Sequence, residues 1–355
     1  MTSTLQARRT AKARSLASRS PRLVQKAYVQ PSINDVHVNR PLTNISVAFM
    51  QDAEGWVASK VFPMVPVEKK SDRYFLYQRD AFNRHEMRER APATESAGGT
   101  YTIDNTPTYF ARTYSFHRDI PDDIRGNADV PLNLDREATE YLTLKQLLLR
   151  EKVWAANYFV TGVWSNEYAG VAGTPAASQF QQWDQAASKP IENVRFMRTA
   201  TKLKGGIRPN TLVLGRYVWD ALMDHPDIIA RLDRGQTTGP AQANMDALAA
   251  LFEIDQILVM DAIENTALEG GTESNAFIGG KHALLVYAAP TPGIMTPTAG
   301  YTFVWTGAPG ASGAGTRITK IRAPLIRSDR LEIDDDFDMK VVSADLGFMF
   351  LNAVA

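Results

Sequence analysis

The sequence predicts an α+β protein, and three observations carry this prediction. Thr211–Leu214 form a short apolar strand that stops at Gly215 and continues directly into an amphipathic helix. Residues 133–161 keep helical periodicity over their whole length, and residues 316–354 are strand-like almost throughout. The strand–helix unit alone also fits an α/β domain.

Composition sets the first limits. At 355 residues, with 44% apolar and 22% charged residues, the chain is long enough for one large or two ordinary soluble domains. Its net charge of zero gives no global field of the kind that marks nucleic-acid binders. The absence of cysteine excludes disulfide scaffolds, thiolate nucleophiles and cysteine metal sites. No apolar run reaches the roughly 18–20 residues of a membrane span or resembles a secretory signal, so we expect a soluble protein made in the cytosol.

The N-terminal residues 1–43 are expected to be an arm. They are rich in serine, threonine and arginine, contain scattered prolines, and have no acidic residue before Asp35. We expect this arm to lie on a partner surface, although its composition also fits an organellar transit peptide or a disordered tail. Its basic residues before Asp35 are Arg8, Arg9, Lys12, Arg14, Arg19, Arg22 and Lys26.

An extended hairpin is predicted over residues 67–116, after globular sequence that begins at residue 44. Two β-type runs, Lys69–Asp80 and Thr100–Phe116, flank a long polar stretch. Because an isolated two-stranded hairpin is marginally stable in water, we expect this one to lie against another subunit. Its charges suit pairs between subunits, with a solvated tip as the alternative: Arg79, Arg84, Arg88, Glu89, Arg90 and Glu95.

A long helix is predicted over residues 132–161. Asn133 can cap it, Asp135 and Glu137 suit the positive end of the helix dipole, and Gly162 can end it. About 27 residues correspond to roughly 40 Å of helix. Its broad apolar face predicts a buried structural spine.

The remaining chain alternates helices and strands and then becomes strand-like. We expect a helix up to Leu203, the strand–helix unit described above, a helix over Met245–Phe252, a strand over Gln256–Met260, and further strands near residues 283–287 and 300–306. The glycine-rich residues 307–315 join two β runs and are expected to form a flexible hairpin tip. In the last segment, Asp334–Asp336 are expected to break the strand.

No combination of residues indicates catalysis or metal binding. The five histidines form no zinc-type pair, and neither G-x-S-x-G nor G-x-G-x-x-G is present. The segment Gly310–Thr316 lacks the lysine and the following helix of a phosphate-binding loop. Asp334, Asp336 and Asp338 begin like a calcium loop, but Met339 occupies the glycine position and no glutamate closes the loop. We expect an exposed acidic turn there, or charges that meet basic groups across a subunit contact. We therefore predict no catalytic, cofactor or metal site and no enzyme; binding of labelled nucleotide would reveal the alternative of a nucleotide-dependent enzyme.

The order of these elements, with N-T-L-V-L-G…W-D-A-L…H-P-D-I from residue 210 and G-Y-T-F-V-W from residue 300, resembles the major capsid proteins of tailed bacteriophages with the Hong Kong 97-type fold. That resemblance implies an N-terminal arm (1–43), an extended hairpin loop (67–116) and an axial domain (190–315). It further implies a peripheral domain made of residues 44–66, 117–189 with the spine helix 132–161, and the return strands 316–355.

The resemblance also implies the function. Such a protein assembles through hexamers and pentamers into the icosahedral head shell that encloses double-stranded DNA, in the virion, after synthesis in the host cytoplasm. Its partners would be itself, with scaffold, portal and cementing proteins as further candidates, and no membrane. The basic arm would face the interior and contact DNA without sequence preference. The alternative is an encapsulin, a bacterial nanocompartment shell of the same fold.

Some members of this capsid family join neighbouring subunits through a lysine–asparagine bond. This chemistry needs a lysine in the hairpin, whereas Lys69 and Lys70 lie only at the base of the predicted hairpin and none lies in its tip. We therefore expect no covalent cross-linking.

Overall fold

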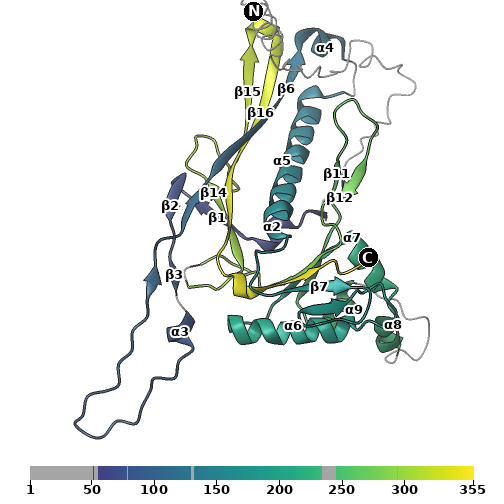
Figure 1. Ribbon diagram of the computed structural model, residues 1–355. Coiled ribbons are helices and arrows are strands. Elements are labelled where there is room, and N and C mark those ends of the chain that lie inside the picture. Colours follow the sequence, from purple (N-terminus) through teal and green to yellow (C-terminus); the bar gives the residue numbers. More distant parts are fainter. Residues whose placement is uncertain (1–50, 52–54, 78, 129–131, 234–244, 294) are drawn as a thin grey trace, which may run out of the picture. The chain divides into compact units, whose positions relative to one another are not determined.

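The computed structural model describes residues 51, 55–77, 79–128, 132–233, 245–293 and 295–355 (Figure 1). Of the described residues, those up to 121 and those from 133 onward belong to one compact unit, and residues 122–128 and 132 belong to a second. Helix α4 (Asp122–Asn127) lies in the second unit. All other described elements lie in the first. The arm predicted over residues 1–43 lies outside the described residues.

One sheet has five strands, and its central strand is the long strand β16 (Ser328–Val341). Strand β6 (Arg112–Pro121) runs antiparallel along one edge of β16. The other edge pairs with β15 (Thr316–Ala323) and then with β14 (Gly300–Trp305), which in turn pairs in parallel with β1 (Met64–Val67). We call this sheet the long-strand sheet.

The glycine-rich segment is not the tip of a hairpin, so that expectation was wrong. Val304 of β14 pairs with Phe337, and Thr316 of β15 pairs with Asp335, on the same edge of β16. Residues 306–315 therefore form a loop between two strands that follow one another along this edge. The turn that reverses the chain is the short 3₁₀ helix η3 (Pro324–Ile326), which ends at Arg327 with a φ of 45°.

The acidic segment is neither a break in the strand nor an exposed turn, and this expectation was also wrong. Strand β16 runs without interruption through Asp334, Asp335 and Asp336, and β6 pairs with it over this stretch. The three residues are only 7%, 2% and 3% exposed. Their cationic and hydroxyl partners, described below, make this burial tolerable.

The predicted spine is helix α5 (Leu134–Tyr158). As expected, Asn133 caps it, because its side chain accepts a hydrogen bond from the backbone N–H of Arg136 at 3.1 Å. The helix ends earlier than residue 161 because the Glu167 carboxylate accepts hydrogen bonds from three successive backbone N–H groups, those of residues 162–164, at 2.7, 3.1 and 3.2 Å. These contacts hold the chain in a turn at Gly162, whose φ is 86°.

A six-stranded sheet forms the other end of the unit. Its strand order is β10 (Gln256–Met260), β9 (Thr211–Gly215), β13 (Ala283–Val286), β17 (Gly347–Leu351), β7 (Glu167–Val171) and β8 (Gln179–Gln181). Strand pairing thus joins β17, β7 and β8 to strands of the range 190–315, while β14 of that range lies in the long-strand sheet. The sheets are therefore assembled from segments far apart in sequence.

Side chains of the six-stranded sheet point alternately to its two faces, and each face packs into a separate hydrophobic core. Leu212, Leu214 and Phe348 belong to a core on one face of the sheet. Residues of four helices join this core: α6 (Pro190–Gly205), α7 (Arg216–Met223), α8 (Pro226–Asp233) and α9 (Met245–Phe252). Val213 and Met349, on the opposite face, pack with the C-terminal half of α5, with α2 (Ala58–Val61) and with the long-strand sheet.

Two hairpins extend from these sheets (Figure 1). The predicted long hairpin has two short ladders, in which β2 (Ser71–Arg73) pairs with β5 (Thr108–Phe110) and β3 (Leu76–Tyr77) with β4 (Ile103–Asp104). A short helix, α3 (Arg79–Phe82), follows β3, and residues 83–102 have no helix or strand. The second hairpin pairs β11 (Ile263–Asn265) with β12 (Asn275–Phe277). Among the described residues, no helix is long and apolar enough to cross a membrane.

Candidate assembly site

The root of the long hairpin packs on the face of the long-strand sheet that points away from α5. The ring of Tyr109 stacks on Phe303 with centroids 4.6 Å apart, and Tyr74 lies 5.3 Å from Phe303. The Tyr109 hydroxyl also donates to the backbone oxygen of Lys69 at 3.2 Å. These aromatic contacts fix the point at which the hairpin leaves the sheet.

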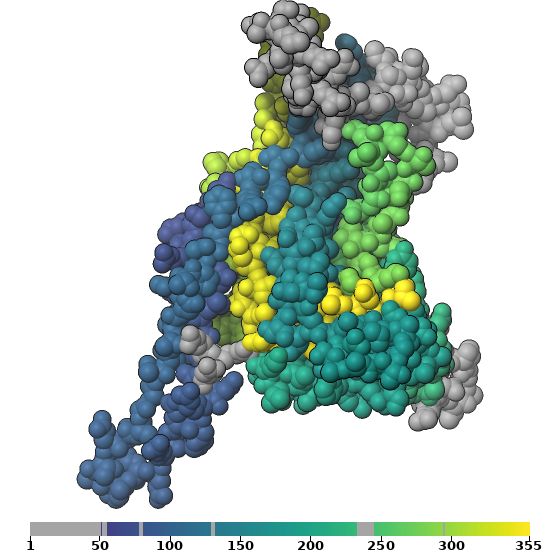
Figure 2. Space-filling view, in the orientation of Figure 1, coloured from purple at the N-terminus to yellow at the C-terminus, as the bar shows by residue number. Residues whose placement is uncertain are grey.

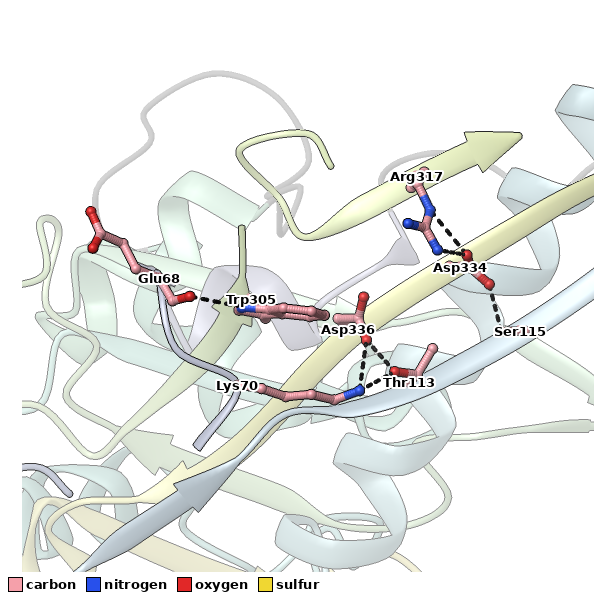
Figure 3. A network of polar contacts seen from close by, with 8 residues as sticks. All are labelled: Glu68, Lys70, Thr113, Ser115, Trp305, Arg317, Asp334 and Asp336. Atoms are coloured by element: carbon pink, nitrogen blue, oxygen red, sulfur yellow. Dashed lines mark hydrogen bonds and ion pairs between the residues drawn. The ribbon is translucent and has the colours of Figure 1, made fainter. Parts of the chain in front are cut away.

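Lys70 ties this root to the central strand (Figure 3). Its Nζ donates to Thr113 Oγ1 at 2.7 Å and lies 3.8 Å from Asp336 Oδ1. It also lies 5.1 Å from the ring centroid of Trp305, within the range of a cation–π contact. Thr113 donates its own hydroxyl to Asp336. One buried carboxylate thus holds both arms of the hairpin.

Asp334 lies two residues earlier on the same face of β16 (Figure 3). It accepts hydrogen bonds from Ser115 Oγ at 2.5 Å and from Arg317 Nε at 3.1 Å. Burial disfavours its ionised form, but the bonds from Ser115 and Arg317 outweigh this effect and lower the pKa of Asp334 below its usual value. Asp334 therefore joins β6 to β15 across the central strand.

Asp335 points to the opposite face and meets the spine helix. The Arg150 guanidinium binds it with both ends of the fork, Nε to Oδ2 at 2.7 Å and Nη2 to Oδ1 at 2.5 Å. The same Nη2 donates to the backbone oxygen of Ala314 at 2.8 Å. One arginine therefore links α5, β16 and the loop 306–315.

Sequence reasoning missed this charged network, whose members are Lys70, Arg150, Arg317, Asp334, Asp335 and Asp336. The available signal was alternation, because Asp334 and Asp336 fall on one face of a strand whose neighbours Ile333 and Phe337 are apolar. Arg150, in a stretch of α5 that is otherwise mostly apolar, was the second signal. Among the described residues, no group of histidine and carboxylate side chains is arranged to hold a metal ion.

The charged hairpin residues named from the sequence lie in or near its irregular tip and are not brought together. Arg84 lies 3.5 Å from Glu86, and Arg90 donates to the backbone oxygen of Thr94. Arg88, Glu89 and Glu95 are exposed and contact no described residue through a hydrogen bond or ion pair. Arg79 begins α3, and its side chain lies outside what the structure describes. The same holds for the seven basic residues that precede Asp35 in the arm: Arg8, Arg9, Lys12, Arg14, Arg19, Arg22 and Lys26.

Aromatic side chains gather on the hairpin without being buried. The rings of Tyr77, Phe82 and Tyr101 lie 5.5–6.4 Å apart, yet Phe82 and Tyr101 remain 51% and 53% exposed. They lie at or beside a groove of about 1210 Å³ between the hairpin, the end of α6 and residues 292–293 and 295–298. Contiguous exposed apolar surface is more common at protein contact sites than elsewhere on a protein.

A buried carboxyl group on α5 holds the short helix α2. Glu151 Oε2 accepts the backbone N–H groups of Val57 and Ala58 at 3.0 and 2.9 Å, while its Oε1 has no hydrogen-bond partner among the described residues. Burial disfavours the ionised form more strongly than these bonds favour it, and it raises the pKa of Glu151 to about 7. Sequence reasoning gave no sign of this group.

Comparison with known proteins gives sequence relatives along nearly the whole chain. The family model described as phage major capsid protein E matches residues 171–317. The major capsid protein of Pseudomonas phage JBD67 is 28% identical over 319 residues, covering 90% of this chain and 97% of the relative. The major capsid protein of Burkholderia phage BcepMu is 24% identical over 317 residues, covering 88% and 95%.

Solved structures show the same fold. A phage-related protein from Bordetella bronchiseptica RB50 superposes with a TM-score of 0.63 at 20% identity, covering 85% of this chain and 93% of that one. The capsid of cyanophage P-SCSP1u gives 0.53 at 11% identity, covering 92% and 99%. The SrpI encapsulin of Synechococcus elongatus PCC 7942 gives 0.53 at 12% identity, covering 89% and 95%. The comparisons therefore confirm the expected resemblance to tailed-phage major capsid proteins, and the solved structures show the Hong Kong 97-type fold.

Proposed function

We propose that this chain assembles through hexamers and pentamers into an icosahedral head shell that encloses double-stranded DNA. The observation that carries the proposal is the long hairpin, which is fixed at its root and bare at its tip. Lys70 and Tyr109 hold the root on the sheet, whereas Phe82 and Tyr101 remain half exposed. A second copy of the chain would cover these side chains.

The physical character of the hairpin tip supports this role. Arg88 and Glu89 make no ion pair within the described chain, so both are available for a neighbour. Individual exposed ion pairs contribute little, about 0–1 kcal/mol each. A shell repeats every contact many times, and weak contacts then add up to a stable particle while wrong contacts can still dissociate.

An encapsulin shell is the second candidate, since the SrpI encapsulin shares the fold. Likeness at 12% identity extends to the fold alone, whereas both sequence relatives are phage capsid proteins. The basic arm supports the phage function, because its charges suit phosphates of packaged DNA. Scaffold, portal and cementing proteins are further proposed partners in the virion.

Electron microscopy of the purified chain tests the proposal. We expect closed shells, or rings of five and six subunits, after size-exclusion chromatography. Co-expression with the neighbouring head genes supplies a scaffold if the chain alone stays monomeric. A monomer under both conditions would refute self-assembly, and shells that enclose an enzyme rather than DNA would favour the encapsulin.

A pair of variants tests the hairpin itself. Arg88→Glu with Arg90→Glu reverses two exposed tip charges, and we expect fewer shells from a chain that folds normally. Lys281→Glu is the matched control, because Lys281 is also exposed and lies in the connection between β12 and β13, outside the hairpin. Equal shell yields from the two variants would show that the tip charges do not contribute to the contact between subunits.

A further inference from the structure

Helix α6 presents an exposed face that combines cations with large apolar side chains. Arg195, Thr199 and Lys202 alternate on this face with Phe196 and Leu203, which are 60% and 88% exposed. Spacings of three, four and seven residues put all five on one side of a helix. Neither Arg195 nor Lys202 forms an ion pair with a described residue. We call this surface the α6 face.

The loop between β11 and β12 presents the opposite combination. Leu268 is 89% exposed and lies between the acidic residues Glu264 and Glu269, with Glu273 further along the loop. Lys152 forms an ion pair with Glu264 at 2.5 Å, and Glu273 accepts a hydrogen bond from Asn275 Nδ2 at 2.8 Å. Glu269 and Glu273 are the carboxylates that lie between the two strands of this hairpin. We call residues 266–274 the acidic loop.

The acidic loop has a defined conformation before any partner binds. Asn265 Oδ1 accepts the backbone N–H groups of Ala267 and Ser274 at 2.9 and 3.1 Å. The backbone N–H groups of Thr266 and Gly271 also donate within the loop, at 2.8 and 2.9 Å. A preorganised loop loses less conformational entropy when it docks.

We infer that the acidic loop of one copy docks on the α6 face of the next copy in a ring. Two cations then face two carboxylates, and Leu268 packs against Phe196 and Leu203. This inference rests on the proposed shell function and names one of the surfaces that the shell uses. Complementary charge of this kind sets the register and the partner more than the affinity.

The two surfaces cannot satisfy one another within one chain. Figures 1 and 2 show α6 beside the six-stranded sheet and the β11–β12 hairpin at a separate place along α5. Two different patches that meet between identical chains form a head-to-tail contact, and such contacts close into rings when the rotation permits. Rings of five and six subunits are the units of the proposed shell.

A nucleic acid is the less suitable occupant of the α6 face. Phosphates require cations and polar donors, whereas Phe196 and Leu203 offer neither. Basic residues do occur without acidic ones from residue 193 to 219, but Arg198 and Arg216 of that run are already paired with Glu253 and Asp261. The apolar side chains therefore favour a protein surface with its own exposed leucine.

Cysteine cross-linking tests the contact directly, because the chain contains no cysteine. Leu203→Cys with Leu268→Cys places one thiol on each surface, and Thr199→Cys with Thr272→Cys samples a neighbouring register. A disulfide forms only where the two Cα atoms come within about 7 Å. In assembled particles we expect oxidation to give a denaturing-gel ladder that reaches five and six linked chains. Each single-cysteine variant is the control and should give no ladder.

Charge reversal gives an independent readout. Arg195→Glu with Lys202→Glu should raise the protein concentration needed for assembly by about tenfold, since each surface pair contributes up to about 1 kcal/mol. Glu269→Lys with Glu273→Lys should do the same, and the four changes together should restore assembly. Circular dichroism checks that each variant folds.

The outcomes separate the two proposals. If shells form but both cysteine pairs stay monomeric, or stop at dimers, the contact is wrong and the shell function stands. If shells of the Arg195→Glu, Lys202→Glu variant contain less DNA while assembly and cross-linking stay unchanged, the α6 face binds nucleic acid and the inference is wrong. If no shells or rings form under any condition, the shell function fails and this contact fails with it.

Discussion

Removing the carboxylate of Asp335 should destabilise this protein severely. The side chains of Arg150 and Asp335 are 9% and 2% exposed, and their two hydrogen bonds measure 2.7 and 2.5 Å. Asp335→Ala leaves a buried guanidinium with the backbone oxygen of Ala314 as its remaining hydrogen-bond partner among oxygen atoms. An uncompensated buried charge lowers the free energy of unfolding by about 3–5 kcal/mol.

The double variant tests the reasoning more sharply than the single one. Arg150→Met with Asp335→Leu removes both charges and keeps approximate volume, so its free energy of unfolding should stay within about 1 kcal/mol of the parent. Arg150→Met and Asp335→Leu, each made alone, would then sum to far more than the double change, which is the signature of a coupled pair. Urea unfolding followed by tryptophan fluorescence measures all four proteins, and the buried Trp154 lies one turn from Arg150.

An exposed pair on the same helix supplies the control. Arg136 and Glu140 lie 2.8 Å apart with side chains 77% and 42% exposed. Glu140→Ala should lower the free energy of unfolding by about 0.5 kcal/mol or less. If Asp335→Ala unfolds as readily as Glu140→Ala, burial of the Arg150–Asp335 pair is not what makes it strong.

Three further predictions follow from individual residues and their contacts. Burial raises the pKa of Glu151 from 4.5 to about 7, so between these pH values the folded chain holds a proton that the unfolded chain has released. The contribution of Glu151 to the free energy of unfolding is therefore fully present below pH 4.5. It declines, by up to about 3 kcal/mol, as pH rises to 7 and beyond. Glu151→Gln should remove this decline, and a parallel pH dependence of urea midpoints in both proteins would contradict it. A Cβ at Gly347 would lie 2.0 Å from the ring of Trp164, so Gly347→Ala should lower the thermal midpoint by an amount equivalent to about 1–3 kcal/mol; an unchanged midpoint would contradict this. Mature particles boiled in detergent should run as monomers, because Lys69 and Lys70 bind Asp72 and Thr113 at the hairpin root; a ladder of linked chains would contradict this.

Local patterns in the sequence were enough to predict the helices and several strands. Helix α9 and strand β10 have the predicted bounds, and Asn133 caps α5 as expected. These features depend on residues within a few positions of one another. The end of α5 was misplaced because Glu167, which holds the following turn, lies outside the periodic segment.

The charged network could not be predicted in the same way. Arg150 and Asp335 are 185 residues apart in sequence, and Lys70 is further still from Asp336. Three consecutive aspartates indicate an exposed turn when only their neighbours are considered. The pairing of β14 and β15 to one edge of β16, which misled the prediction for residues 306–315, is equally a long-range property.

In the proposed shell, the charged network at the root of the long hairpin and the exposed tip of that hairpin would act together. Each subunit contact in a shell must be weak, so little free energy is available to order a loose loop on docking. Lys70, Thr113 and Asp336 fix the direction of the hairpin before any neighbour arrives. Only the irregular residues 83–102 then remain to be ordered by the partner. In the proposed shell, polar groups whose own net contribution to stability is small, since both charges must leave water, would thereby make assembly easier by holding the proposed contact surface in place.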